Sequence, residues 1–161
     1  MKVELRFVAH RSLLGPLFRL AQAGAKWTHV EARTAGGYTG AMLIGGVQER
    51  TSDYDAGAFE HEVFVSLEMT EAQAEAFFAF LRDKIGQAYD PIAVLYFFGL
   101  FADRNWEDPT QWECTELIAA ALIACGWLPD NPKVPACRMT PWYLYGLTST
   151  IATMSNGGAD A

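Results

Sequence analysis

The chain has 161 residues, of which 51% are hydrophobic and 13% aromatic, and it carries 12 basic against 19 acidic side chains. This length predicts one domain with a single compact core, and the hydrophobic content excludes wholesale disorder. A formal net charge of −7, with no cluster of basic residues, argues against nucleic acid as a partner.

The hydropathy pattern bears on localisation. No apolar run reaches the roughly 20 residues that a membrane-spanning helix needs. Residues 1–7 alternate apolar and charged side chains, without the continuous apolar segment of a secretion signal. The three cysteines, at positions 114, 125 and 137, are an odd number and lack CxxC spacing. We therefore expect a cytoplasmic protein with reduced thiols and no transmembrane segment.

The first half of the chain predicts a sheet and one helix. Strands are expected over residues 1–7, 27–34, 41–47 and 60–69, where apolar residues alternate with others. A helix over residues 12–23 would lie between the first two strands, with Ser12 as its cap. The turn at Gly36-Gly37 makes a hairpin of the second and third strands, and the polar residues 48–57 form a loop.

The second half is predicted to be mainly helical. Thr70 and Gln73 form a capping box that begins a helix ending at Gly86. A second box, residues 110–113, begins a helix that runs to Cys125. We expect one domain over residues 1–153 and a flexible tail over residues 154–161, which is rich in small and polar residues.

Cys114 would lie in or just after the first turn of the later helix. Backbone amides at a helix start, together with a nearby imidazolium, lower a thiol pKa and can form an oxyanion hole, which favours a nucleophile. Glu113 and Glu116 would raise that pKa if they faced the sulfur. The alternative is a small buried hydrophobic residue, which is the interpretation we give to Cys125, while Cys137 is expected to be an ordinary thiol. No metal or cofactor is expected, because ligand pairs at zinc-site spacing are absent.

His29 is the candidate base because it lies inside a predicted strand. Glu31 is two residues further on, so it projects from the same strand face and is expected to orient the His29 ring. The alternative is a half-buried histidine satisfied by a backbone carbonyl. His10 lies at a junction of strand and helix, and His61 is expected at a solvated rim.

Three segments resemble the circularly permuted branch of the NlpC-type, papain-like cysteine peptidase superfamily, which includes YiiX-like bacterial proteins and lecithin:retinol acyltransferase relatives. Thr28-His29-Val30 is similar to its histidine strand, and Gly86-Gln87-Ala88-Tyr89-Asp90 to its G-x-x-Y-D element. Glu113-Cys114-Thr115-Glu116-Leu117 is similar to its nucleophile helix, and the order of histidine before cysteine is the permuted one.

The resemblance implies an α+β, papain-like fold in which an antiparallel sheet carrying the histidine packs against the helix bearing the cysteine. It implies Cys114 as nucleophile, His29 as base and Tyr89 as a support for the oxyanion or the substrate. In the family a third polar residue usually comes from the strand after the histidine. Residues 41–47 lack such a residue, so either Glu31 or Gln48 substitutes for it, or the dyad works without an orienting group.

The predicted function is that of a thiol hydrolase that cleaves an amide through a Cys114–His29 dyad and a thioester intermediate. The resemblance implies a peptide substrate of bacterial cell-wall type. Without a secretion signal, access to the cell wall would need lysis, phage-type delivery or another export route. Two alternatives remain at this point. One is a lipid amidase or acyltransferase, and the other is a binding or assembly module of weak or no activity, for example a phage-associated one.

Overall fold

The computed structural model describes residues 1–11, 25–92 and 110–157. Its elements in chain order are β1 (Lys2–His10), β2 (His29–Thr34), β3 (Gly37–Met42), β4 (Gly46–Thr51), β5 (Phe59–Glu68), α2 (Glu71–Lys84), β6 (Ala88–Tyr89), β7 (Gln111–Trp112), α4 (Cys114–Ala124), the 3-10 turn η1 (Ala136–Arg138) and α5 (Pro141–Gly157). The α+β class predicted from the sequence is confirmed. The predicted helix over residues 12–23 and the aromatic segment over residues 95–101 lie outside the described residues.

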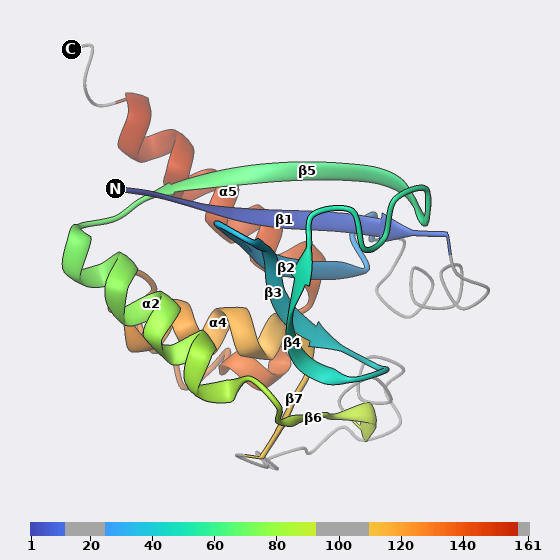
Figure 1. Cartoon of the computed structure of the whole chain (residues 1–161). Coiled ribbons are helices and arrows are strands. Elements are labelled where there is room, and N and C mark those ends of the chain that lie inside the picture. Colours follow the sequence, from blue (N-terminus) through green and yellow to red (C-terminus); the bar gives the residue numbers. More distant parts are fainter. Residues whose placement is uncertain (12–24, 93–109, 158–161) are drawn as a thin grey trace.

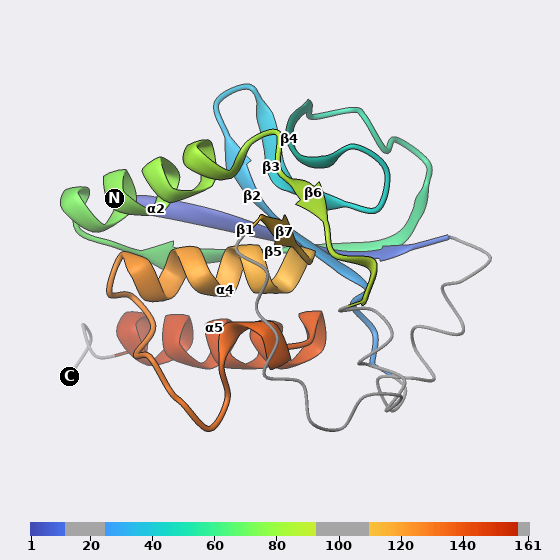
Figure 2. The ribbon, with the colours of Figure 1, turned by 90° about the horizontal axis from the view of Figure 1, so that it is seen from below.

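One antiparallel sheet of five strands, in the order β4-β3-β2-β1-β5, organises the molecule (Figure 1). Helices α4 and α5 lie side by side along one face of this sheet, and α2 packs against α4 (Figure 2). Helix α4 contacts β2 and β3, whereas α5 contacts β5. The amino-terminal end of α4 is thereby brought to the strand that carries His29.

Strand alternation explains which sheet face the helices cover. Val3, Leu5 and Phe7 of β1 are fully buried in the core, and the Phe7 ring meets the ring of Tyr145 of α5 edge to face at 5.3 Å. Side chains at alternate positions project from opposite faces, so Arg6 projects from the other face. The strand register places Arg6 directly opposite Glu31 of β2.

The predicted hairpin forms, since β3 pairs with β2, but the predicted bounds of its second strand are wrong. Strand β3 ends at Met42 and β4 begins at Gly46, so the predicted strand over residues 41–47 spans the turn between them. Leu43 and Ile44 lie in that turn and are 62% and 89% exposed. Because the chain already turns back after Met42, residues 48–51 belong to β4 and not to the expected loop over residues 48–57. The apolar run over residues 41–47 thus predicts a strand where the chain turns.

A close backbone approach anchors β6, the strand of Tyr89. Gly46 has a φ of +66°, and a Cβ atom there would lie 2.1 Å from the carbonyl oxygen of Gln87. The Val47 amide donates to the same oxygen at 3.0 Å. A glycine is thus required at this turn both for its left-handed backbone and for the contact that it permits.

The two predicted capping boxes have different outcomes. The box at Thr70 is confirmed, since the Gln73 amide donates to Thr70 Oγ1 at 3.2 Å and the Thr70 amide donates to Gln73 Oε1 at 3.0 Å. The box at residues 110–113 is wrong, because Gln111 and Trp112 form β7 in parallel pairing with β6. Helix α4 begins at Cys114 instead, with Glu113 as its cap.

The carboxyl-terminal region departs from the expected tail, because α5 continues to Gly157. Residues 158–161 lie outside the described residues. Within the described ranges, no helix combines the length and the apolar character that crossing a bilayer requires.

Candidate functional site

Cys114 is the first residue of α4 and is buried, with 3% of its surface exposed. Its neighbour Glu113 caps the helix: Glu113 Oε2 accepts the amides of Thr115 at 2.7 Å and of Glu116 at 3.1 Å. The other oxygen of Glu113, Oε1, accepts the Cys114 thiol at 2.7 Å. The helix amides that we expected to serve the sulfur are therefore bonded to a carboxylate.

This arrangement reverses the expected direction of the thiol pKa. Burial raises the pKa of Cys114 above its ordinary value, and the charge of Glu113 and the bond to it raise the pKa further. The amide of Val30 and the hydroxyl of Thr115 oppose this effect without overcoming it. Glu113 faces the sulfur after all, and the resting thiol is protonated.

The sulfur lies against the strand of the candidate base. The backbone of Val30, the residue after His29, lies close enough to the Cys114 sulfur to lower the thiol pKa. Burial raises the pKa of Glu113, and this outweighs the opposing effects of its hydrogen bonds and of a charged His29 ring. Cys114, Glu113 and His29 thus belong to one neighbourhood. Within the described residues, however, no hydrogen bond joins the Cys114 sulfur to the His29 ring.

His29 is buried and is oriented by Glu31. His29 Nε2 lies 3.4 Å from Glu31 Oε2, and the Glu31 side chain is fully buried. Because an ionised carboxylate only accepts hydrogen bonds, the contact requires the hydrogen of His29 on Nε2 and leaves Nδ1 as the basic nitrogen. Gln48 does not substitute for Glu31, since its amide donates to the carbonyl of Gly45 in its own turn.

Glu31 is ionised despite its burial. Burial alone would raise the pKa of Glu31, but hydrogen bonds from His29, Arg6 and Tyr54 and the charge on His29 hold that pKa below its ordinary value. The sequence did not single out Arg6 or Tyr54. Arg6 lies within a predicted strand, but the register that sets it opposite Glu31 cannot be obtained from the alternation of one strand.

Tyr89 and His10 complete the neighbourhood. Burial raises the pKa of Tyr89, and negative charge on Glu113 or on a Cys114 thiolate would raise it further, so the phenol is neutral. The His10 ring lies 5.5 Å from the His29 ring, centre to centre, and burial followed by the charge of His29 lowers the pKa of His10. His61 is exposed, in keeping with the predicted rim position.

Metal binding finds no support within the part of the chain that the structure describes. No group of three histidine, cysteine, aspartate or glutamate side chains is arranged there to hold a metal ion.

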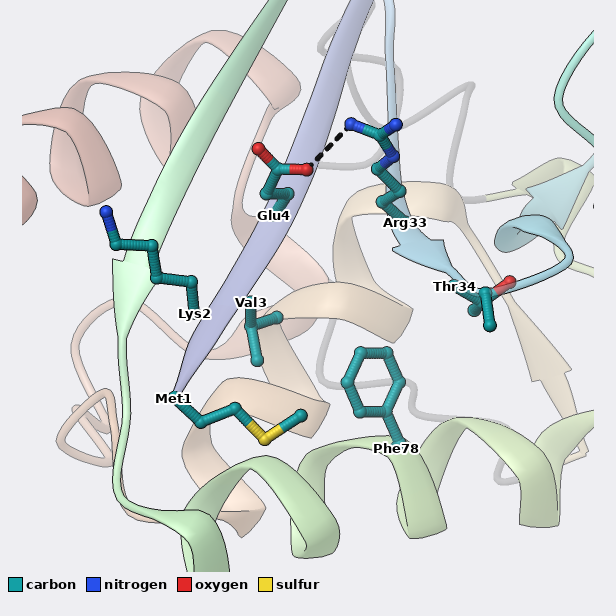
Figure 3. Close-up of a pocket in the computed structure, with 8 residues that line it drawn as sticks. Met1, Lys2, Val3, Glu4, Arg33, Thr34 and Phe78 are labelled. Carbon is teal, nitrogen blue, oxygen red and sulfur yellow. Dashed lines mark hydrogen bonds and ion pairs between the residues drawn. The ribbon is translucent and has the colours of Figure 1, made fainter.

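A cavity of about 240 Å³ lies at the other end of the sheet (Figure 3). It is lined by the start of β1, the end of β2 and Phe78 of α2, and Figure 3 shows the ion pair of Glu4 with Arg33 at its edge. His29 pairs with Val8 near the far end of β1. The cavity therefore shares no residue with the neighbourhood of Cys114.

We expect Glu113→Gln to stabilise the fold at neutral pH. The pKa of Glu113 is higher in the folded than in the unfolded chain, so as pH rises above about 4.5 the unfolded chain loses this proton first and the folded state loses relative stability. A neutral glutamine removes that loss. Urea unfolding at several pH values measures the free energy of unfolding of both proteins. The value for the variant, relative to that of the wild type, should rise as pH increases from about 4 towards 7.

Glu71→Gln, at the exposed first turn of α2, is the control for this experiment. It should leave the pH dependence of stability nearly unchanged. A Glu113→Gln protein whose stability relative to the wild type does not rise between about pH 4 and 7 would contradict the raised pKa of Glu113.

Comparison of the chain with protein-family models and with curated proteins found no match.

Proposed function

We propose that this protein is a cysteine hydrolase in which Cys114 attacks an acyl carbonyl and His29 moves the protons. The observation that carries the proposal is the joint placement of the two residues. Cys114 begins α4, and its sulfur lies near the backbone of Val30. His29, the residue before Val30 in β2, is buried and contacts Glu31 through Nε2. Nδ1 of His29 is left as a base.

The proposed reaction begins when the thiol turns from Glu113 towards His29. Nδ1 takes the thiol proton, the sulfur forms a bond to the carbonyl carbon, and the π electrons of that carbonyl move to oxygen. The tetrahedral intermediate collapses, the amide C–N bond breaks, and the leaving nitrogen receives the proton from His29. Water then attacks the thioester with His29 as base, which releases the acid and restores the thiol.

Tyr89 would donate its phenolic hydrogen to the carbonyl oxygen as negative charge develops there. Two features support this role, namely a neutral phenol and the place of Tyr89 in β6, where it pairs with Trp112, two residues before Cys114. The amides of Thr115 and Glu116 do not suit it, since Glu113 already accepts from both.

The finer assignment to a permuted papain-like fold is part of the same proposal. An antiparallel sheet carries His29, the helix that begins with Cys114 packs on β2 and β3, and histidine precedes cysteine in the chain. These features agree with the arrangement that the sequence resemblance implies. The proposed substrate class, a peptide amide of bacterial cell-wall type, rests on that resemblance alone.

One observation favours a second candidate, a binding module of little or no activity. The Cys114 thiol donates a hydrogen bond to Glu113, and the pKa of the thiol is raised. A catalytic cysteine usually has a lowered pKa, because only the thiolate attacks. In this second candidate Cys114 is an inert buried residue of an inherited fold.

Thiol alkylation separates the two candidates. The three cysteines are 3%, 8% and 6% exposed at positions 114, 125 and 137, so burial alone predicts equally slow reaction with iodoacetamide. A working dyad should make Cys114 react at least about tenfold faster than the other two near neutral pH, because His29 can take its proton. Peptide mapping by mass spectrometry over time measures the three rates.

His29→Ala is the control, and it should remove the advantage of Cys114. Equal and slow labelling of all three cysteines in the wild type would rule out the proposed dyad and leave the binding module.

A further inference from the structure

Arg6 lies at the centre of a buried cluster of charges behind His29. Its side chain is 2% exposed, and its guanidinium bonds to three carboxylates. The contacts are Glu31 at 2.8 Å, Asp55 at 3.0 Å and Glu62 at 2.9 Å, with the rings of Tyr38 and Phe59 centred 4.6 and 4.9 Å from Cζ. Three residues of this cluster, Arg6, Glu31 and Asp55, are almost completely buried.

Both oxygens of Glu31 are engaged. Oε1 accepts from Arg6 Nη1 at 2.8 Å, and Oε2 accepts from the Tyr54 hydroxyl at 2.9 Å as well as contacting His29 Nε2 at 3.4 Å. Two donors on different oxygens fix both the position and the plane of a carboxylate. The remaining acceptor direction of Oε2 is the one that faces the His29 ring.

The neighbouring strand leaves Glu31 little room to move. Gly40 of β3 lies beside Glu31, and a Cβ atom at position 40 would be 2.9 Å from the Cβ of Glu31. Any side chain there would push Glu31 away from β3. Glycine at position 40 therefore admits Glu31 to the place in which Arg6 and Tyr54 hold it.

We propose that Arg6 and Tyr54 are positioning residues, which hold the Glu31 carboxylate so that its Oε2 accepts from His29 and selects the Nε2–H tautomer of that ring. The proposal rests on the function proposed above, because it assigns to the pair the orientation of the catalytic base. Neither residue touches the reacting atoms. They act through Glu31, and the tautomer that they select leaves Nδ1 free to accept a proton.

The energetics of buried ion clusters support this role. A buried ion pair contributes little more to stability than apolar side chains of similar volume would, because both charges lose their hydration. What such a cluster supplies is a defined direction for each polar group. The alternative is that Arg6 only ties the turn containing Asp55 to the sheet, in which case Tyr54 would have no effect on His29.

Tyr54→Phe tests the proposal, with Tyr38→Phe as its matched control. The two rings are neighbours, with centroids 6.4 Å apart, but only the Tyr54 hydroxyl bonds to Glu31. Long-range ¹H–¹⁵N spectra of ¹⁵N-histidine protein near pH 8 report the tautomer of each ring, and His10→Gln and His61→Gln assign the signals. We expect the Nε2–H tautomer of His29 in the wild type and in Tyr38→Phe, and a mixture of both tautomers in Tyr54→Phe.

Gly40→Ala is the second variant, since it displaces Glu31 without removing a polar group. It should also give mixed tautomers. In the alkylation assay both variants should slow the labelling of Cys114 by about tenfold, the effect of losing one hydrogen bond to a charged group. Labelling of Cys125 should stay the same in both.

The outcomes are separable. A single unchanged tautomer in both Tyr54→Phe and Gly40→Ala, or mixed tautomers already in the wild type, would overturn the positioning role. Tautomers that respond as expected in a protein whose Cys114 labels no faster than Cys125 would leave the effect on His29 standing and remove the hydrolase.

Discussion

Arg6→Met is expected to lower the free energy of unfolding by about 3–5 kcal/mol, the usual cost of removing one partner from a buried ion pair. The variant leaves Glu31 and Asp55 nearly inaccessible to water and without their cation. Methionine fills much of the volume of the arginine stem, so the loss reports the uncompensated charge more than a cavity. Urea unfolding followed by circular dichroism measures it.

Arg33→Met is the matched control. Arg33 also pairs with a glutamate, Glu4, and lies over an aromatic ring, that of Phe64, but its side chain is 54% exposed. Its loss should cost no more than about 1 kcal/mol, because exposed ion pairs are screened by water. Equal losses in the two variants would contradict the account of Arg6 as the counter-ion of buried carboxylates.

At acid pH the difference in free energy of unfolding between the wild type and Arg6→Met should become smaller. The pKa of Glu31 is lowered in the folded wild type, so its stabilising contribution is present above the unfolded value of about 4.5 and is lost as pH falls through the lower folded value. In the variant, protonation of Glu31 removes a charge that has lost its main partner. The same unfolding experiment at about pH 3 to 4 should therefore show a smaller gap than at pH 7.

Under the proposed mechanism Cys114→Ala is expected to lower the rate of hydrolysis by at least about 10³-fold, because Cys114 supplies the attacking sulfur. The fold should persist in this variant, since the buried thiol is small and Oε1 of Glu113 keeps the hydroxyl of Thr115 as a donor. Muropeptides and short-chain acyl esters, compared as substrates, measure the activity. Preference for muropeptides would support the cell-wall peptide class, and preference for esters would favour the lipid amidase or acyltransferase alternative.

Cys125→Ala is the control for this measurement. Cys125 follows the last residue of α4, about 16 Å along the helix from Cys114, and its thiol donates to the carbonyl of Leu122. Its activity should match that of the wild type. Hydrolysis that survives in Cys114→Ala would disprove the assigned nucleophile.

Local patterns predicted the elements well where neighbouring residues alone decide them. The alternation over residues 60–69 appears as β5, and the Thr70 capping box begins α2 as expected, because both depend on side chains a few residues apart. The similar pattern at Thr110 failed, since Gln111 and Trp112 pair with β6, a segment more than 20 residues away. Strand pairing between distant segments overrode a local capping preference.

In the candidate site, too, some residues can be placed from the sequence pattern and others only from the tertiary structure. The placement of Glu31 on the face of His29 follows from the two-residue period of a strand, and the structure gives the contact between them. Arg6, Tyr54 and Asp55 came from a strand and an expected loop with nothing in their sequence to join them. Only the register of β1 on β2 and the fold of the turn after β4 bring them to Glu31.

The sequence by itself determined a single α+β chain, a cysteine at a helix start and a strand that carries His29 with Glu31, because these depend on periodicity and short-range spacing. The tertiary structure decided the electrostatics of that cysteine. Its buried sulfur hydrogen-bonds to Glu113, and burial beside a carboxylate raises the thiol pKa that a free helix start would lower. Glu113 is adjacent to Cys114 in sequence, but whether it faces the sulfur and how deeply both side chains are buried depend on the packing of distant segments, so no local pattern contains the direction of that pKa.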